Sequence, residues 1–337
     1  MKAVGYREPL PITDPRSLLD LELPDPSPGG RDLLVQVKAV SVNPVDTKVR
    51  RRSAPPPGDV QVLGWDASGV VLETGPEVVL FRPGDRVWYA GSKVRPGTNS
   101  ELHLVDERIV GHKPESLDYA QAAALPLTGI TAWELLFERL AVAPGKVYGD
   151  DSLLIIGAAG GVGSVLTQLA CRLTGLRVIG TASRPETAQW VRSLGAHAVI
   201  DHGRPLSEEL AGTGTPQVTH VASLTRTDLH FAEIVKALAP QGRLALIDDP
   251  EPIDVRQLKQ KCISLHWELM FTRSMFETPD MITQHRLLTE LAELVDAGVI
   301  RTTVADHFGV INAANLRRAH ALVESGRARG KIVLEGF

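Results

Sequence analysis

The spacing of hydrophobic and polar positions divides the chain into three stretches with different periodicity. In the first, up to about residue 113, short runs of alternating or β-branched residues are separated by turns that contain Pro-Gly pairs. Short strands with turn signals at such intervals are typical of a compact barrel-like or sandwich unit. The strands that this pattern predicts lie at residues 1–6, 33–40, 60–63, 69–72, 86–89 and 101–105.

From about residue 114 the pattern changes to strands that alternate with helices. Residues 118–125 and 131–140 have helical spacing, and further helices are predicted at 186–194 and 229–238. Alternation of this kind is typical of a parallel sheet with helices on both faces. The predicted strands of this sheet lie at residues 152–156, 176–180, 198–200, 218–222, 243–247 and 263–267.

The third stretch, after residue 276, contains an amphipathic helix around residues 287–295 and a final strand at 330–334. Asn312 is expected to cap a helix that runs to about residue 324. We expect this tail to return to the first domain. The fold class is therefore α/β, with a β-rich domain of residues 1–126 and 275–337 and a doubly wound parallel-sheet domain of residues 127–274.

The most informative stretch is residues 153–163, where an apolar strand is followed by Gly157, Gly160 and Gly163 and then by a helical apolar stripe. One glycine allows a sharp turn, another lets a pyrophosphate approach the backbone, and the third lets helix and strand pack closely. The free N–H groups of the helix then face an anion. This arrangement predicts a dinucleotide site, whereas the alternative is a tight turn between core elements. The GxxGxxG spacing alone is a weak signal.

The end of the second strand of this unit indicates which dinucleotide is bound. An NAD site would place a carboxylate about 20 residues past the glycine loop. Residues 180–185 contain no acid, but Ser183 and Arg184 can both bind a 2′-phosphate. The sequence therefore favours NADPH over NADH. In the alternative, Arg184 is a solvated residue before the next helix.

Composition narrows the class of protein. The 337 residues are 43% hydrophobic and 23% charged with a net charge of −4, so no basic surface indicates nucleic acid or an anionic membrane. No run approaches the roughly 18 apolar residues of a membrane span, and the N-terminus has no signal-peptide pattern. Two cysteines cannot form a disulfide framework. We expect a cytoplasmic protein without a nucleic-acid or membrane partner, and a solvated loop for residues 50–52, with a contact to cofactor phosphates as the alternative.

Several segments resemble those of a known superfamily. Residues 41–46, 63–71, 83–87 and 157–163 are similar to the quinone oxidoreductase branch of the medium-chain dehydrogenase/reductases, and the whole chain resembles its zinc-type alcohol dehydrogenase-like proteins. The resemblance implies a GroES-like β-rich catalytic domain, a Rossmann domain and an active site between them. It also implies a homodimer, since relatives are usually dimers and sometimes tetramers.

The residues that would hold a metal are missing from this chain. Zinc-dependent members place a Cys in the segment equivalent to residues 43–46 and a Gly-His-Glu where this chain has Gly64, Trp65 and Asp66. A catalytic zinc needs about three protein ligands, so Asp66 alone is not a site. Those members also carry four clustered cysteines, whereas this chain has two. We therefore expect no metal, although ten histidines are scattered along the chain.

The resemblance also implies roles for individual residues. Asn43 should lie by the nicotinamide and bond the cofactor or the acceptor oxygen, and Thr131 should approach the ring from the Rossmann side; the alternatives are a turn residue and a helix-start residue. Tyr89 faces either the acceptor or the core. Backbone N–H groups should meet the pyrophosphate, and His202 should lie near the 2′-phosphate, with plain surface exposure as its alternative. Further residues should line the cofactor cleft, with core packing as the alternative for Leu224 and Ile247. These cofactor-binding residues are Gly160, Gly161, Val162, His202, Leu224, Ile247, Phe271 and Lys331.

Loss of zinc narrows the range of reactions that we expect, because a metal normally polarises a carbonyl or stabilises an alkoxide. A quinone or an α,β-unsaturated carbonyl needs less help, since the negative charge delocalises onto its oxygen. The expected activity is zinc-independent, NADPH-dependent hydride transfer to such an acceptor, with positioning as the main contribution of the protein. An alcohol dehydrogenase, an enoyl-thioester reductase and a non-enzymatic NADPH-binding or RNA-binding structural protein remain as alternatives.

Overall fold

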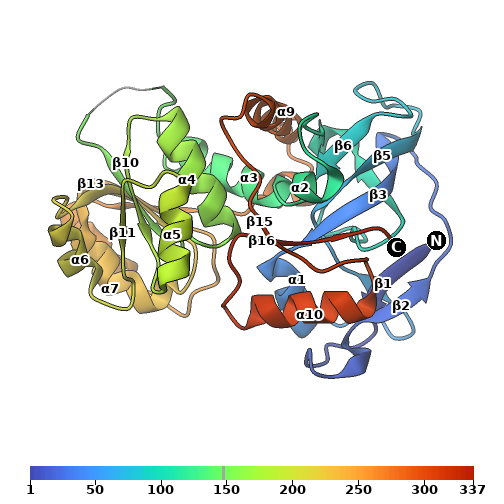
Figure 1. Ribbon diagram of the computed structural model, residues 1–337, viewed down its shortest axis with the longest axis horizontal. Coiled ribbons are helices and arrows are strands. Elements are labelled where there is room, and N and C mark those ends of the chain that lie inside the picture. The colour runs from blue at the N-terminus through green and yellow to red at the C-terminus, as the bar shows by residue number, and fades with distance from the viewer. Residues whose placement is uncertain (146–148) are drawn as a thin grey trace. The chain divides into compact units, whose positions relative to one another are not determined.

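The computed structural model describes residues 1–145 and 149–337. The chain divides into two compact units, and Figure 1 shows the elements of each. Unit 1 contains Met1–Ile130 and Phe271–Phe337, and unit 2 contains Thr131–Met270. The sequence places the corresponding boundaries after residues 126 and 274.

Unit 1 is a GroES-like fold built around the long strand β3 (Asp32–Val42). At one end β3 pairs with β16 (Lys331–Glu335), with Ile332 opposite Val42, so the C-terminal tail returns to the first unit as expected. A small second sheet has the order β2 (Leu19–Glu22), β1 (Lys2–Tyr6), β4 (Gln61–Val62). The other strands of the β3 sheet are β5 (Ala67–Thr74), β6 (Arg86–Tyr89), β7 (Leu102–Asp106), β8 (Val110–His112) and β15 (Val304–His307).

The helices of unit 1 lie mainly in segments that follow the strands. Asn312 caps α10, since its side chain accepts a hydrogen bond of 2.8 Å from the backbone N–H of Asn315, as predicted. The α-helices are α1 (Pro44–Arg52), α2 (Tyr119–Ala123), α8 (Thr272–Phe276), α9 (Thr283–Asp296) and α10 (Ala313–Glu324), with η1 (Pro15–Ser17) and η2 (Glu107–Ile109) as short 3₁₀ turns. Helix α3 (Pro126–Trp133) crosses the boundary between the units.

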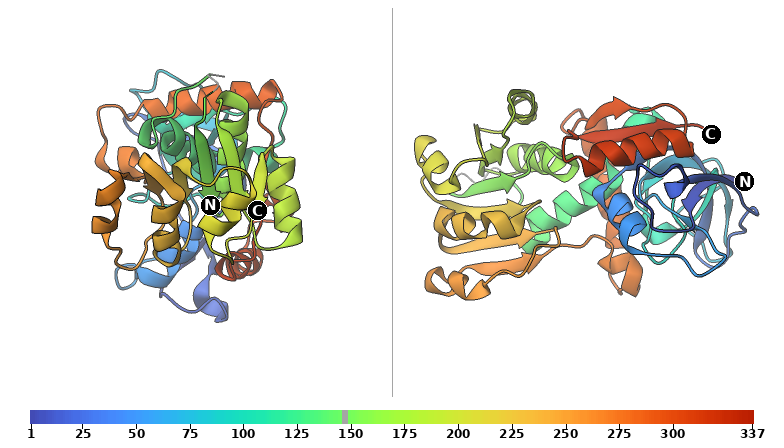
Figure 2. Two further views of the ribbon diagram at one scale, coloured as in Figure 1. Left: turned by 90° about the vertical axis from the view of Figure 1, so that its left-hand side faces the viewer. Right: turned by 90° about the horizontal axis from the view of Figure 1, so that it is seen from below.

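Unit 2 is a Rossmann domain with a six-stranded, wholly parallel sheet of order β11-β10-β9-β12-β13-β14. The chain runs outward from β9 to β11 and then returns to place β12 on the other side of β9, which makes the β9/β12 position the switch point. Helices cover both faces of the sheet (Figure 2). The strands are β9 (Ser152–Ile156), β10 (Arg177–Thr181), β11 (Ala198–Ile200), β12 (Val218–Ser223), β13 (Leu238–Leu246) and β14 (Ser264–Trp267).

The helices of unit 2 are α4 (Gly161–Leu173), α5 (Pro185–Ser193), α6 (Leu206–Gly212) and α7 (Thr227–Ala237), with the π-helix η3 (Glu134–Arg139) and the 3₁₀ helix η4 (Val255–Lys261). The helix predicted at residues 131–140 was only partly right. It begins earlier, at Pro126, and changes to π geometry at Glu134. Among the described residues, no helix is both long and apolar enough to cross a bilayer.

The loop expected at residues 50–52 was wrong, as was the solvent exposure expected for Arg50, whereas Arg51 and Arg52 are exposed as expected. These residues form the last turn of α1, which begins with Pro44 and is capped where the Asp46 carboxylate accepts from the Asn43 backbone N–H at 2.7 Å. The Arg50 side chain is fully buried, and its guanidinium donates to the Leu10 carbonyl and the Glu324 carboxylate. A buried guanidinium needs such partners, and Arg50 finds both of them inside unit 1.

Candidate functional site

The glycine loop joins β9 to α4 at the switch point of the sheet. Gly157 has φ of +83°, and a Cβ there would lie 3.1 Å from Thr225 Cγ2, so both conformation and space favour glycine. Gly160 is the N-cap of α4, and its N–H donates to the Gly157 carbonyl at 3.1 Å. A Cβ on Gly163 would lie 2.5 Å from the Gly157 oxygen and 2.6 Å from Ala158 Cα. Gly163 therefore lets α4 approach the loop closely.

The first turn of α4 offers backbone donors for an anion. The N–H groups of Gly161, Val162 and Gly163 have no intrahelical acceptor, because the first N–H groups of any helix lack one. The positive end of the helix dipole adds to the attraction. A pyrophosphate fits this set of donors.

Thr181, at the end of β10, links the loop to the neighbouring strand ends. Its hydroxyl accepts from the Gly157 N–H at 3.1 Å and lies 3.1 Å from Nδ1 of His202, which follows β11. Sequence reasoning assigned no role to Thr181, although a hydroxyl at the end of the second strand was a usable signal. The glycine loop, Thr181 and His202 are thus one hydrogen-bonded group at the carboxyl edge of the sheet.

Ser183 and Arg184 follow the same strand. Ser183 is exposed, and Arg184 is the N-cap residue of α5. The Arg184 guanidinium pairs with the Glu186 carboxylate at 3.0 Å and is partly exposed. A phosphate that binds Arg184 would compete with this pair, and an exposed pair of this kind is worth about 0–1 kcal/mol. The pair therefore does not block the predicted contact.

His202 faces a second imidazole at the same edge. The rings of His202 and His230 are 6.1 Å apart and edge to face. Burial lowers the pKa of both side chains, and the Arg226 guanidinium lowers both further. His202 is therefore held neutral near pH 7 and can donate or accept a hydrogen bond. Leu224 and Ile247, half-buried, follow β12 and β13 at this edge.

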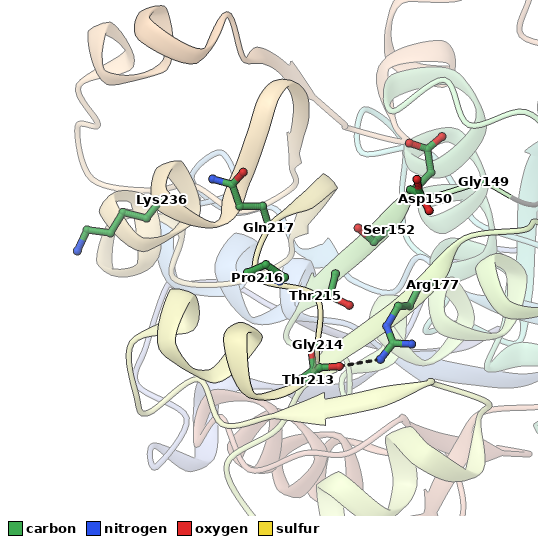
Figure 3. Close-up of a pocket in the computed structure, with 11 residues that line it drawn as sticks. Gly149, Asp150, Ser152, Arg177, Thr213, Gly214, Thr215, Pro216, Gln217 and Lys236 are labelled. Atoms are coloured by element: carbon green, nitrogen blue, oxygen red, sulfur yellow. Dashed lines mark hydrogen bonds between the residues drawn. The ribbon is translucent and has the colours of Figure 1, made fainter.

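A pocket of unit 2 lies at the opposite, amino edge of the sheet (Figure 3). It is lined by residues that precede or begin β9, β10 and β12, among them Asp151, Arg177 and Gln217. Arg177 donates to the Thr213 carbonyl at 2.9 Å within it. None of the predicted cofactor residues lines this pocket, so it is distinct from the glycine-loop edge.

In unit 1 the predicted residue Asn43 belongs to a buried polar cluster with Asp66 and Lys331. Asn43 Nδ2 donates to Asp66 Oδ2 at 2.7 Å, and Lys331 Nζ donates to the same oxygen at 3.0 Å and to Asn43 Oδ1. The Ser41 hydroxyl donates to Asp66 at 2.8 Å. These residues come from β3, the N-cap of α1, the segment before β5, and β16, and all are at most 3% exposed.

A second carboxyl group lies at the edge of this cluster. Burial raises the pKa of Asp46 to about 7, while the hydrogen bond from the Asn43 N–H and the Lys331 charge act against it. Asp46 is 1% exposed. The ionisation of Asp46 therefore falls near neutral pH inside unit 1.

The remaining predicted residues are buried in their own units. Phe271 packs edge-on against Trp65, with ring centroids 6.0 Å apart, and Thr131 lies within α3 at 5% exposure. Tyr89 is a core residue, since it is fully buried and its hydroxyl lies 3.1 Å from Nδ1 of His103. Burial lowers the pKa of His103 to about 4. The contacts of Phe271, Thr131 and Lys331 with a cofactor stay predictions.

The donor set of unit 1 does not fit a zinc ion. In the described part of the chain, no group of three or more His, Cys, Asp or Glu side chains could hold a metal. Where ligands are needed, the side chains are Asn43, Trp65 and Asp66, and an ammonium group is already bound to Asp66. A cation cannot bind beside another cation that takes its oxygen ligands.

Comparison with known proteins places the chain among dehydrogenases. Residues 29–122 match the family model described as alcohol dehydrogenase GroES-like domain, and residues 194–334 match that of zinc-binding dehydrogenase. A zinc-type alcohol dehydrogenase-like protein of Staphylococcus aureus is 38% identical over 339 residues, which cover 99% of each chain.

Solved structures of similar proteins also belong to dehydrogenases and oxidoreductases. A protein of Rhizobium etli, named as a candidate zinc-dependent alcohol dehydrogenase, is 60% identical with a TM-score of 0.96 and covers 100% of this chain and 98% of its own. The quinone oxidoreductase of Escherichia coli, solved with NADPH, is 26% identical with a TM-score of 0.84 and covers 99% and 100%.

Proposed function

The chain belongs to the quinone oxidoreductase branch of the medium-chain dehydrogenase/reductase superfamily, and we propose that it is a zinc-independent, NADPH-dependent reductase of quinones or α,β-unsaturated carbonyls. As an NAD(P)H oxidoreductase of this family it uses a nicotinamide cofactor and a small-molecule substrate. The observation that carries the proposal is the carboxyl edge of the unit 2 sheet, where backbone N–H groups without an intrahelical acceptor lie beside a strand end without an acid.

The choice of NADPH is supported by the residues after β10. Residues 181–185 contain no carboxylate that would repel a 2′-phosphate, and Arg184 offers a guanidinium whose ion pair with Glu186 is partly exposed. Ser183 is exposed and able to donate. In the E. coli quinone oxidoreductase the nucleotide is NADPH, which agrees with this choice.

The choice of acceptor is supported by the chemistry of unit 1. The cofactor supplies a hydride when bound. The residues of this chain offer hydrogen-bond donors and buried apolar walls, which favours an acceptor whose oxygen already stabilises negative charge. Asn43 is the proposed donor to that oxygen or to the cofactor, and Trp65 and Phe271 are the proposed walls. No metal takes part, because the donor set around Asp66 is filled by Lys331.

Turnover assays test the activity. NADPH oxidation is measured with 1,4-benzoquinone, 2-cyclohexenone, simple alcohols with NADP⁺, and an enoyl-CoA, each with and without EDTA. We expect turnover with the quinone or the enone that EDTA leaves unchanged. Turnover of alcohols alone, or complete loss on chelation, would contradict the proposal.

A substitution at Arg184 tests the cofactor choice. Arg184→Ala should raise KM for NADPH about tenfold while leaving KM for NADH unchanged, since a charge-assisted bond to phosphate is worth about 1.5–3 kcal/mol. Arg192→Ala, an exposed arginine at the other end of α5, is the matched control. Equal effects on both nucleotides would remove Arg184 from the phosphate site.

We also propose that the protein is a homodimer. Strand β14 is an edge strand of the unit 2 sheet, and Trp267 on it and Leu269 after it are 55% and 46% exposed. An open edge with large apolar side chains is a surface that proteins usually cover. Light scattering of the wild type and of Trp267→Glu would test this, and a monomeric wild type at micromolar concentration would refute it.

A further inference from the structure

The Lys331 ammonium has a complete set of ligands inside unit 1. Its three N–H groups face three oxygens: the Val42 carbonyl at 3.1 Å, Asp66 Oδ2 at 3.0 Å, and Asn43 Oδ1. An ammonium carries three hydrogen-bond donors and no acceptor, so all three donors of Lys331 are used. Lys331 is 3% exposed. The side chain is therefore a fixed cation rather than a solvated surface lysine.

The ammonium determines which way the Asn43 amide points. An ammonium only donates, so the Asn43 atom that it contacts must be the oxygen. The other end of the amide is then the NH₂ group, which donates one hydrogen to Asp66, an acceptor when ionised. An NH₂ group has two hydrogens, and the bond to Asp66 uses one of them. Lys331 and Asp66 together prevent the amide from flipping.

Asp66 is engaged on both oxygens. Oδ1 accepts from the Leu127 backbone N–H at 2.8 Å, and Oδ2 accepts from Ser41, Asn43 and Lys331. Each carboxylate oxygen has about two lone-pair sites, so the three donors on Oδ2 leave none there for a metal ion, and Oδ1 already holds the Leu127 N–H. The family model that matches this chain is described as zinc-binding, and the two facts disagree.

We propose that the Lys331 ammonium is the resident cation of this site in place of a metal, and that Lys331 and Asp66 position Asn43 as a hydrogen-bond donor. The first part depends on the contacts within unit 1 alone. The second part rests on the proposed function, since it takes the acceptor oxygen or the cofactor as the group that receives the second Asn43 hydrogen. Lys331 and Asp66 then act through Asn43 and need not touch the substrate.

Metal analysis and stability test the first part without any turnover. The full-length protein is purified from zinc-supplemented medium and analysed by plasma mass spectrometry, and thermal unfolding is followed with and without EDTA. We expect far less than one zinc per chain and no effect of EDTA on Tm. Lys331→Met should lower Tm by several degrees, because it leaves the Asp66 charge buried and unpaired. Lys331→Met combined with Asp66→Asn should recover part of this loss.

The control for these variants is Lys2→Met, an exposed lysine of the same unit. One bound zinc per chain, or a Lys331→Met protein that unfolds at the same temperature as Lys2→Met, would overturn the first part. The double variant keeps the test informative if Lys331→Met alone does not fold, because it removes both charges together.

Steady-state kinetics test the second part. Lys331→Met should lower kcat/KM about 10- to 100-fold, the range seen when residues that orient metal ligands are replaced. Asn43→Ala should have a similar effect. Lys331→Met combined with Asn43→Ala should lose no more than Asn43→Ala alone, because groups that act as a unit are not additive.

Multiplicative losses in the combined variant would overturn the positioning role, since a merely structural lysine would add its own defect. If the wild type turns over none of the acceptors, the proposed function fails, and the metal content and the stability series still decide whether Lys331 is the resident cation.

Discussion

Replacing Gly163 by alanine should damage unit 2 although alanine is the better helix former. Gly163 is in the first turn of α4, where alanine would gain up to about 1 kcal/mol of helix propensity over glycine. The new Cβ would lie 2.5, 2.6 and 2.7 Å from the Gly157 oxygen and from Cα and C of Ala158. All three are backbone atoms, so no side chain can rotate away. The loop or the helix has to move instead.

The net cost follows from two opposing effects. Overpacking of a closely packed site costs about 1–3 kcal/mol, and the helix propensity returns up to about 1 kcal/mol. We therefore expect Gly163→Ala to destabilise the protein by about 0–3 kcal/mol. At about 2–8 °C per kcal/mol the shift in Tm is measurable over most of this range. The displaced loop and helix carry the proposed backbone donors to the pyrophosphate. We therefore expect the free energy of NADPH binding to weaken by more than the free energy of unfolding falls.

Gly212 supplies the matched control. It ends α6 in the same unit, has no positive φ, and a Cβ there would meet no atom within 4 Å. Gly212→Ala should stabilise by about 0.4–1 kcal/mol by restricting the unfolded chain. Urea unfolding gives the stabilities, and quenching of tryptophan fluorescence gives the Kd. If Gly163→Ala binds NADPH as tightly as Gly212→Ala does, the close approach of α4 to the loop is not what shapes the site.

Two further predictions concern buried ionisable groups. Burial and the neighbouring Glu134 raise the pKa of Glu268 to about 9, so stability that is present below its ordinary pKa of 4.5 is lost as pH rises towards 9. Glu268→Gln keeps an acceptor for Arg139. Its free energy of unfolding in urea should therefore rise relative to that of the wild type from pH 5 to pH 9. Parallel curves of stability against pH for the two proteins would contradict this. Neither ring nitrogen of His320 has a hydrogen-bond partner in the described part of the chain, and burial, with the Arg50 charge, lowers its pKa to about 3. Because only the unfolded chain takes up the proton of His320 between pH 6.5 and pH 3, the folded state loses stability as pH falls through this range. His320→Leu removes this loss and the two unsatisfied ring nitrogens, so it should stabilise the protein by about 1–3 kcal/mol at pH 7 and make it unfold less readily in acid. Unchanged acid unfolding would count against this prediction.

Local patterns predicted much of this fold because they depend on neighbours in the chain. The strands at residues 86–89, 152–156 and 198–200 were predicted at their observed bounds. The cap at Asn312 was also predicted, since it needs only a backbone N–H three residues away. Helix α1 was missed. Its Pro44 start and its Asp46 capping residue were visible in the sequence, but the run of arginines after them was interpreted as a solvated loop.

The polar cluster of unit 1 could not be predicted, because its members are far apart in the chain. Lys331 is 288 residues from Asn43 and 265 from Asp66, and no periodicity relates β16 to β3. The resemblance indicated that Asn43 and Lys331 matter, but not that they bond to each other. The link from Gly157 through Thr181 to His202 was missed for the same reason, since it depends on the register of three parallel strands.

The two candidate regions differ in how far their polar groups are already satisfied. In unit 1 the Lys331 ammonium has three acceptors and both oxygens of the Asp66 carboxylate accept hydrogen bonds, so this cluster is ordered without a ligand. At the glycine loop of unit 2, the first N–H groups of α4 have no partner in the helix, and an anion or water must complete them. A ligand that supplies this anion stabilises the folded state by RT ln(1 + [L]/Kd), which grows with the logarithm of the ligand concentration. Binding energy should therefore come mainly from the loop of unit 2, while the preformed cluster of unit 1 can orient Asn43 at no further cost in ordering when the ligand arrives.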